Sequence, residues 1–146
     1  MAQRSNITII SSAAIAVCLT ATTTAAKPTR QEAANLKIVQ ALVSGLADPH
    51  PDAAGLAELF SEDASVSFSE YEESARGRQQ VETKIATLFA DGTRYQIKVH
   101  ASRALGPVVI NARDDIAINA AGSSTVFKVT GVFVIIGGKI RSWKDY

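Results

Sequence analysis

Three charged residues have the types and spacing expected of acid–base catalysis. Arg113 and Asp115 lie two positions apart in an apolar segment predicted to be a strand, and Asp145 lies near the end of the chain. Side chains at positions i and i+2 of a strand point to the same face of a sheet. A buried charge without a partner is unfavourable, so Arg113 is expected to hold both carboxylates. This arrangement can keep two acids in different protonation states, as general acid–base catalysis requires.

Two opposing effects would separate the roles of the two aspartates. Desolvation raises the pKa of a carboxyl group, whereas a charge-assisted hydrogen bond from a guanidinium lowers it. The less well-paired acid could therefore stay protonated at neutral pH and donate its proton, while the other carboxylate deprotonates water. The alternative is an exposed cross-strand salt bridge, which is common on antiparallel sheets and contributes little to stability.

Three helices are predicted to cover the sheet that carries these residues. Thr29 and Glu32 form a capping box, and apolar residues follow at spacings of three and four up to Leu46. A second, short helix is predicted to begin at residue 52 and to carry Leu56, Leu59 and Phe60. A third is predicted over residues 79–90, where Asp91 and Gly92 end it. These helices precede most of the strands, which indicates an α+β fold with helices on one sheet face.

The remaining segments alternate as strands do. Strands are predicted over residues 65–68, 94–103, 107–120, 123–136 and 139–146. Gly137 and Gly138 form a tight hairpin turn between the last two, because both positions can adopt positive φ. The result is a curved, largely antiparallel sheet.

The strand pattern also predicts an apolar pocket around the charged trio. Ala117 shares a face with Arg113 and Asp115, and in the last strand the odd positions, from residue 139 to Asp145, share a face. The hairpin is expected to bring Trp143 and Asp145 beside or close to Val129 and Phe127 of the preceding strand. The predicted pocket residues are Trp143, Phe127, Val129, Val66, Phe68 and Ala117.

Several short motifs resemble limonene-1,2-epoxide hydrolases and their relatives in the NTF2-like, SnoaL-like superfamily. They are Gly-Val-Phe at 131–133, Gly-Lys-Ile at 138–140, Trp-Lys-Asp-Tyr at 143–146, Leu-Phe-Ser-Glu-Asp-Ala at 59–64 and Arg-Gly-Arg at 76–78. The resemblance covers nearly all of residues 32–146. It implies a cone-shaped fold with a curved mixed or antiparallel sheet and about three helices over its concave face. It also implies a homodimer packed through the sheet.

The same resemblance implies a role for each charged residue. Asp145 would activate water, Asp115 would protonate the epoxide oxygen, and Arg113 would bridge them. The family also places a Tyr and an Asn on the strand after the second helix to hold the water. In this chain the matching positions are Val66 and Phe68, whose side chains form no hydrogen bonds. The chain further ends at Tyr146, where family members usually continue into a tail that helps close the pocket.

Residues 1–26 have the pattern of a secretory signal peptide. A basic start with Arg4 is followed by an uncharged, mostly apolar run and by small residues that end before Lys27. The sequence therefore predicts an exported protein, periplasmic or secreted, whose mature part is one domain over residues 27–146 without a membrane span. Cys18, the only cysteine, lies in the leader, so the mature part would have no disulfide and no thiolate metal site.

Charge and residue types exclude several other functions. The 15 basic and 14 acidic residues would balance once Arg4 is removed, so no basic surface is expected to bind nucleic acid. The histidines, His50 and His100, lack the spacing of metal ligands, and neither a metal nor a cofactor is expected.

Three functions agree with these observations. The leading hypothesis is a cofactor-independent hydration of a small apolar epoxide to a diol. The second is a non-catalytic protein that binds a hydrophobic molecule, with Arg113 and the aspartates as polar anchors. The third is a SnoaL-like cyclase or isomerase in which one aspartate removes a proton beside a carbonyl. The fold alone does not distinguish them.

Overall fold

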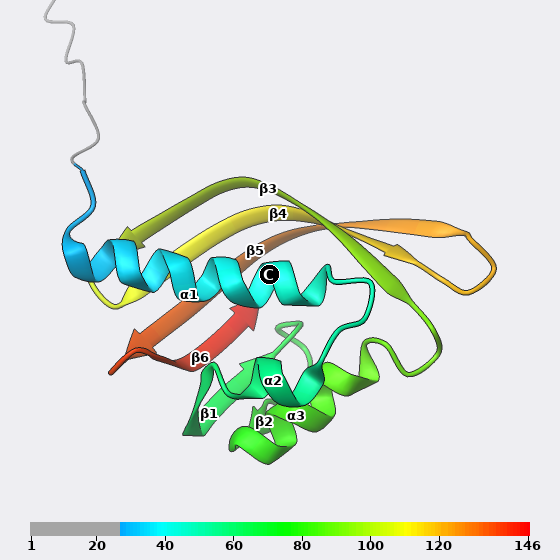
Figure 1. Ribbon diagram of the computed structural model, residues 1–146, viewed down its shortest axis with the longest axis horizontal. Coiled ribbons are helices and arrows are strands. Elements are labelled where there is room, and N and C mark those ends of the chain that lie inside the picture. Colours follow the sequence, from blue (N-terminus) through cyan, green and yellow to red (C-terminus); the bar gives the residue numbers. More distant parts are fainter. Residues whose placement is uncertain (1–26) are drawn as a thin grey trace, which may run out of the picture.

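The computed structural model describes residues 27–146, so the predicted signal peptide lies outside the described residues. Figure 1 shows α1 lying across a curved sheet, with α2 and α3 grouped near β1 and β2. The elements are α1 (Arg30–Leu46), α2 (Ala53–Ala57), β1 (Phe60–Ser67), β2 (Ala75–Arg76), α3 (Arg78–Thr87), β3 (Arg94–Leu105), β4 (Val108–Ile118), β5 (Ser124–Ile136) and β6 (Lys139–Asp145). None of the helices in the described residues is long and apolar enough to cross a membrane.

The predicted capping box at the start of α1 is confirmed, and it also attaches the helix to the sheet. Thr29 Oγ1 accepts a hydrogen bond from the Glu32 N–H at 3.2 Å, and Glu32 Oε2 accepts one from the Thr29 N–H at 2.8 Å. The other carboxylate oxygen of Glu32 accepts from the N–H of Gly106 at 2.9 Å. The Asn35 amide donates to the Gly106 carbonyl at 2.9 Å. The β3–β4 turn thus holds the first two turns of α1 in place.

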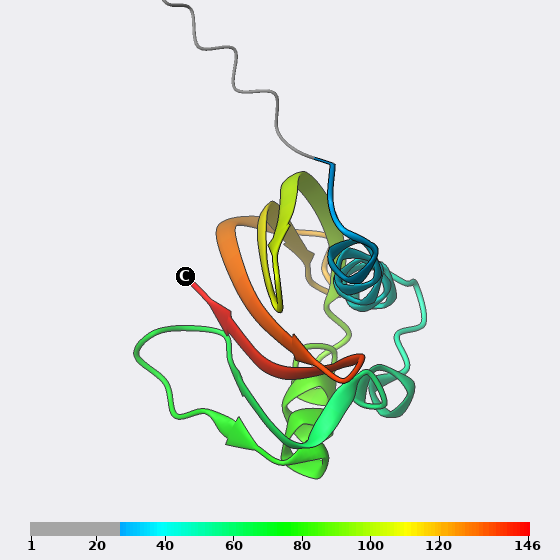
Figure 2. The same ribbon diagram turned by 90° about the vertical axis from the view of Figure 1, so that its left-hand side faces the viewer.

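The six strands form one mixed sheet in the order β2-β1-β6-β5-β4-β3. All neighbours are antiparallel except β1 and β6, which are parallel. The end-on view in Figure 2 shows the sheet curving around the side that the helices face. The α+β cone predicted from the sequence is therefore confirmed.

A bulge in β6 decides which of its side chains face the helices. Ile135 pairs with Ile140, but Val134 pairs with Ser142, so Arg141 is an extra residue in β6. The prediction that the odd positions from Lys139 onward share one face is wrong. Lys139 and Arg141 are exposed, whereas Ile140 is buried. The bulge changes the alternation, and only beyond it do the odd positions face inward.

The bulge also sets the partners of the site residues in β6. Trp143 lies opposite Phe133, and Asp145 lies opposite Gly131. The predicted neighbours, Val129 and Phe127, lie further along β5. Without the bulge the hairpin register would pair Trp143 with Val132 and Asp145 with Thr130, so the bulge shifts the pairing by one residue and explains only a small part of the difference. Both turn glycines have the expected positive φ.

The second helix is shorter than predicted. It ends at Ala57, and Phe60 begins β1 rather than continuing the helix. Phe60 is fully buried and pairs with Ile140 of β6. Sheet pairing between two segments far apart in the chain therefore overrides the helical spacing of this short apolar run.

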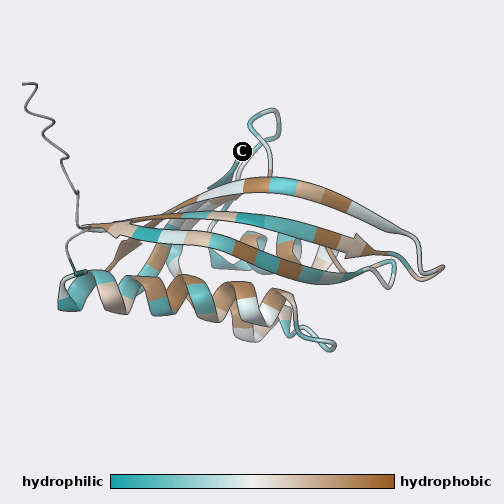
Figure 3. Cartoon of the chain, turned by 90° about the horizontal axis from the view of Figure 1, so that it is seen from above, coloured by the Kyte–Doolittle hydropathy of each residue, from teal (hydrophilic) through white to brown (hydrophobic). Residues whose placement is uncertain are grey.

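Helices cover only one end of the concave face. The buried core lies between α1, α3 and the inner sides of β1, β6 and β5. The β4–β5 hairpin extends beyond α1, as Figure 3 shows from above. Phe127, in this extension, is 50% exposed, whereas Phe133 on the same face of β5 is fully buried.

Candidate functional site

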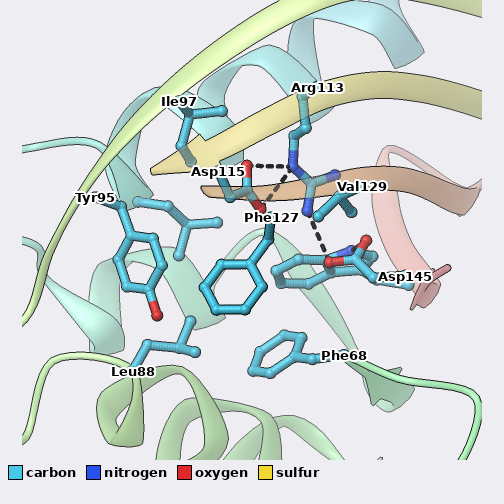
Figure 4. Close-up of a pocket in the computed structure, with 11 residues that line it drawn as sticks. Phe68, Leu88, Tyr95, Ile97, Arg113, Asp115, Phe127, Val129 and Asp145 are labelled. Carbon is cyan, nitrogen blue, oxygen red and sulfur yellow. Dashed lines mark hydrogen bonds and ion pairs between the residues drawn. The ribbon is translucent and has the colours of Figure 1, made fainter. Parts of the chain in front are cut away.

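Arg113 and Asp115 lie side by side on the concave face of β4, as their spacing predicts. Arg113 Nε donates to both oxygens of Asp115, at 2.9 and 3.1 Å (Figure 4). The Arg113 residue is 2% exposed, and the side chain of Asp115 is 15% exposed. The pair is therefore not the exposed cross-strand salt bridge that was the alternative.

Asp145 reaches the same guanidinium from β6. Arg113 Nη2 donates to Asp145 Oδ2 at 2.7 Å, and Trp143 Nε1 donates to Asp145 Oδ1 at 2.6 Å. Asp145 is only 6% exposed. Burial raises the pKa of Asp145, although Arg113 and the hydrogen bond from Trp143 act in the opposite direction. The acid that lies deepest is therefore held in a state that binds a proton more strongly than a free aspartate.

An aromatic cluster holds Trp143 and thus the inner side of the site. The ring of Trp143 stacks on Phe133, with 5.6 Å between the ring centroids, and Phe68 packs at 4.9 Å in a tilted orientation. The guanidinium carbon of Arg113 lies 5.9 Å from the Trp143 ring centroid, close enough for a cation–π interaction. These contacts cover the inner side of the site and fix the orientation of the indole N–H.

A cavity of about 230 Å³ opens beside the charged trio. Most of the residues that line it are apolar, and they come from α1, β3, β4, β5, β6, the segment after β1 and the turn after α3. They are Leu46, Phe68, Leu88, Tyr95, Ile97, Arg113, Asp115, Phe127, Val129, Trp143 and Asp145. Figure 4 shows the charged groups at one side and the aromatic rings of Tyr95, Phe127 and Phe68 around the hollow. This polarity suits a mostly apolar ligand that carries one reactive polar group.

Two residues predicted to line the pocket lie elsewhere. Val66 is fully buried in the core, where it pairs with Trp143, and it does not reach the cavity. Ala117 follows Asp115 by two residues on the same face of β4, but it does not line the cavity. Its cross-strand neighbour on β3, Tyr95, lines the cavity instead. Phe68, Phe127, Val129 and Trp143 lie where the sequence predicts them.

Sequence reasoning did not name four lining residues, which are Leu46, Leu88, Tyr95 and Ile97. The sequence does contain a pattern that could identify them. Tyr95 and Ile97 share the apolar face of one strand, and Leu46 and Leu88 lie at the ends of helical segments. Tyr95 adds the one phenolic hydroxyl among the lining residues. Burial raises the pKa of Tyr95, and the nearby charges of Asp115 and Asp91 raise it further. Tyr95 is therefore a neutral hydrogen-bonding group at the outer side of the cavity.

The acidic and histidine side chains of the described residues do not gather into a metal site. Within residues 27–146, no group of three or more His, Cys, Asp or Glu side chains is arranged to hold a metal ion. Among the residues that line the cavity, Asp115, Asp145 and Tyr95 carry the carboxyl and phenol groups that can transfer a proton.

Comparisons with known proteins identify the family and the fold. The family model described as limonene-1,2-epoxide hydrolase catalytic domain matches residues 33–146. None of the curated proteins matches the chain in sequence. Among solved structures, an epoxide hydrolase of this type from Mycobacterium tuberculosis is 23% identical, with a TM-score of 0.69 over 79% of this chain and 83% of that chain.

Two further structures show the same fold with other described activities. A putative SnoaL-like polyketide cyclase from Jannaschia sp. is 14% identical, with a TM-score of 0.72 over 83% of this chain and 90% of that chain. The epoxide hydrolase/cyclase-like enzyme SalBIII of salinomycin pyran-ring formation is 18% identical, with a TM-score of 0.67 over 77% of this chain and 88% of that chain. At these identities the likeness shows the fold.

Proposed function

Because the chain belongs to the limonene-1,2-epoxide hydrolase family, we propose that it hydrates a small apolar epoxide to a diol at the Arg113 site. The observation that carries the proposal is the position of Arg113 between two carboxylates at the wall of an apolar cavity. The guanidinium balances the charge of one carboxylate, so the site is neutral when the other carboxyl group retains a proton. A shared proton is what an acid–base pair needs to open an epoxide ring.

In the proposed reaction each aspartate has one role. Asp145 removes a proton from water, whose oxygen attacks an epoxide carbon as the carbon–oxygen bond breaks. Asp115 gives its proton to the departing oxygen, so water and epoxide together become the diol. Arg113 then stands between a protonated Asp145 and an ionised Asp115, and proton exchange with solvent restores the initial state. Arg113 and the indole N–H of Trp143 stabilise the ionised form of Asp145, and once ionised this carboxylate is a stronger base than a free aspartate because burial raises its pKa.

The test uses three asparagine variants and a panel of terpene and aryl epoxides. Asp145→Asn and Asp115→Asn are each expected to lower diol formation by about 10²–10⁴-fold, the usual contribution of a general acid or base. Asp114→Asn is the matched control, because Asp114 lies between Arg113 and Asp115 in sequence but pairs with His100 at 2.9 Å on the other sheet face. Its activity is expected to match that of the unmodified protein. If Asp145→Asn keeps full turnover, or no epoxide is hydrated, the proposal fails.

One observation favours a second candidate, a non-catalytic protein that binds an apolar ligand. The resemblance places a water-holding Tyr and Asn at positions 66 and 68, where this chain has a buried valine and a phenylalanine that lines the cavity. A water held by Asp145 alone is less well positioned, which lowers the rate. Calorimetric binding of an apolar epoxide without formation of a diol would identify this function. A cyclase or isomerase in which an aspartate removes a carbon-bound proton is the third candidate, and deuterium exchange into a ketone would reveal it.

We also propose that the protein is exported and acts as a homodimer. The predicted signal peptide supports export, which N-terminal sequencing of the secreted protein would test.

No helix of the described residues covers the convex side of the sheet, where Ile110 and Val126 are 49% and 55% exposed. A second copy packed on this side would bury them, so Ile110→Lys is expected to reduce the molar mass measured by light scattering. A monomeric unmodified protein would contradict the dimer.

A further inference from the structure

Gly131 occupies the point at which the side chain of Arg113 crosses the sheet. Arg113 belongs to β4 and Asp145 to β6, so the guanidinium must pass over β5 to reach its second carboxylate. Neighbouring strands lie about 4.8 Å apart, which makes this a span of two strand spacings. On β5, Gly131 is the direct partner of Asp145 on one side and of Asn111 on the other. A side chain at position 131 would therefore stand in the path of the guanidinium.

The distances show how little room there is. A Cβ atom on Gly131 would lie 2.5 Å from Arg113 Nη1, 2.8 Å from Phe133 Cε2 and 3.0 Å from Asp145 Oδ1. Real Cβ atoms are not found below about 3.0 Å from other heavy atoms, so even a methyl group would force the site to shift. Arg113 Nη1 is buried without a hydrogen-bond partner of its own. Its place next to Gly131 is therefore set by the bonds that the other guanidinium nitrogens make to Asp115 and Asp145.

The backbone gives no other reason for a glycine here. Gly131 is absent from the six glycines with positive φ, which include Gly137 and Gly138 of the hairpin turn. It lies inside β5 and pairs regularly with both neighbouring strands. Glycine in a strand interior is otherwise unfavourable, and it often marks the close approach of another group. The approaching group here is the Arg113 guanidinium.

We propose that Gly131 is a positioning residue, whose missing side chain allows Arg113 to hold Asp115 and Asp145 at the same time. Its catalytic consequence rests on the proposed hydration reaction, but its effect on the charged trio exists without any substrate. In Gly131→Ala the guanidinium is displaced from β5. The bond from Arg113 Nη2 to Asp145 is then lost, while the bond to Asp115 on the same strand can persist.

The primary measurement is a carbon NMR titration of the Asp145 carboxyl group in the substrate-free protein. Arg113 opposes the effect of burial on Asp145, so losing this contact is expected to raise the pKa of Asp145 further. The same variant is expected to lower kcat for the epoxide on the order of 10²-fold, the scale of a 1 Å misplacement, with a smaller change in KM. Thr130→Ala, on the neighbouring residue of β5, is the control and is expected to alter neither quantity.

Two double variants separate the overlaps. Gly131→Ala with Phe133→Leu removes the ring atom nearest to the new methyl group, so this protein is expected to fold even if the single variant does not. The overlap with Arg113 remains, so the Asp145 titration of the double variant is expected to be shifted relative to that of Phe133→Leu alone, which itself alters the stacking on Trp143. The second double variant starts from Arg113→Lys, which lacks the Nη1 atom. In this background Gly131→Ala has no overlap with Nη1 to create, so it is expected to shift the pKa of Asp145 much less than it does in the unmodified protein.

Each outcome decides one question. An unchanged Asp145 titration in the folded Gly131→Ala, or in the double variant compared with Phe133→Leu alone, overturns the role of Gly131, whatever happens to turnover. An equal shift with and without the Arg113→Lys substitution overturns it as well, because the effect would not pass through the guanidinium. If no epoxide is hydrated by the unmodified protein while these shifts occur, the proposed function fails and the role of Gly131 in placing Arg113 stands.

Discussion

The two ends of the concave face are built from the same strands but differ in packing. At one end Phe133, Phe60 and Trp143 stack beneath the helices and leave no exposed apolar surface. At the other end Phe127 and Tyr95 line the cavity, and the β4–β5 hairpin continues beyond α1 (Figure 1). Arg113 lies at the boundary between these two regions, which we call the packed end and the open end.

This difference gives the two aspartates different environments with a single arginine. Asp145 belongs to the packed end, where Trp143 donates to it and only 6% of the residue is exposed. Asp115 belongs to the open end, where its side chain has more contact with solvent and faces the cavity. Unequal burial of two carboxyl groups is a general way to separate their affinities for a proton. The predictions below test this contrast.

The largest effect is expected from removing the group that joins the two ends. Arg113→Met leaves Asp145 buried without a charge partner, which typically costs about 3–5 kcal/mol. The free energy of unfolding in urea at pH 7 is expected to fall by this amount. Arg103→Met, on an exposed position of β3, serves as the control and is expected to change stability by less than about 0.5 kcal/mol. A loss below about 1 kcal/mol for Arg113→Met would show that the trio does not bear on stability.

Two phenylalanines on one face of β5 provide the most direct comparison. Phe133→Ala at the packed end is expected to cost about 3–5 kcal/mol, since it removes a fully buried ring and leaves a cavity. Phe127→Ala at the open end is expected to cost only about 1 kcal/mol, because half of that ring is already exposed. Phe127→Ala should instead raise KM or weaken ligand binding. Equal losses of stability from the two variants would contradict the division into packed and open ends.

The contrast also explains what the sequence could predict about the fold. Local signals were sufficient for α1, whose capping box and apolar spacing agree with the structure, and for the hairpin at Gly137 and Gly138. Phe60 was assigned to a helix because its pairing with Ile140 is a contact between distant segments, which local spacing does not contain. The extra residue Arg141 in β6 is likewise invisible in the alternation of a single strand.

The candidate site could be predicted where side chains follow the strand period, and less well where packing decides. Arg113 and Asp115 share a face because they are two residues apart, and the structure joins them to Asp145. Val66 is predicted to line the pocket, but it is fully buried in the core and does not reach the cavity. Gly131 carries no chemical group, so only the distances around its missing side chain reveal that it matters.

A smaller effect is expected from the indole that protects Asp145 at the packed end. Trp143→Phe removes the N–H that lies 2.6 Å from Asp145 Oδ1 but keeps an aromatic ring in the stack. A hydrogen bond to a charged group contributes about 1.5–3 kcal/mol, so stability at neutral pH is expected to fall within that range. The pKa of Asp145 is expected to rise further, because this bond favours the ionised form. If NMR finds the pKa of Asp145 unchanged or lowered in Trp143→Phe, the indole does not act on this carboxylate.

The smallest effect is the pH dependence that Asp145 itself contributes to stability. Its pKa is raised in the folded protein, so the folded state holds the proton more tightly than the unfolded chain, where an aspartate titrates near about 3.9. The stabilising contribution is therefore complete below about pH 4 and is lost as pH rises through the folded pKa, by at most about 1.4 kcal/mol per pH unit. Subtracting the unfolding free energies of Asp145→Asn from those of the unmodified protein at each pH isolates this contribution. The difference is expected to decrease with rising pH, and an increase would mean that Arg113 outweighs burial at the packed end.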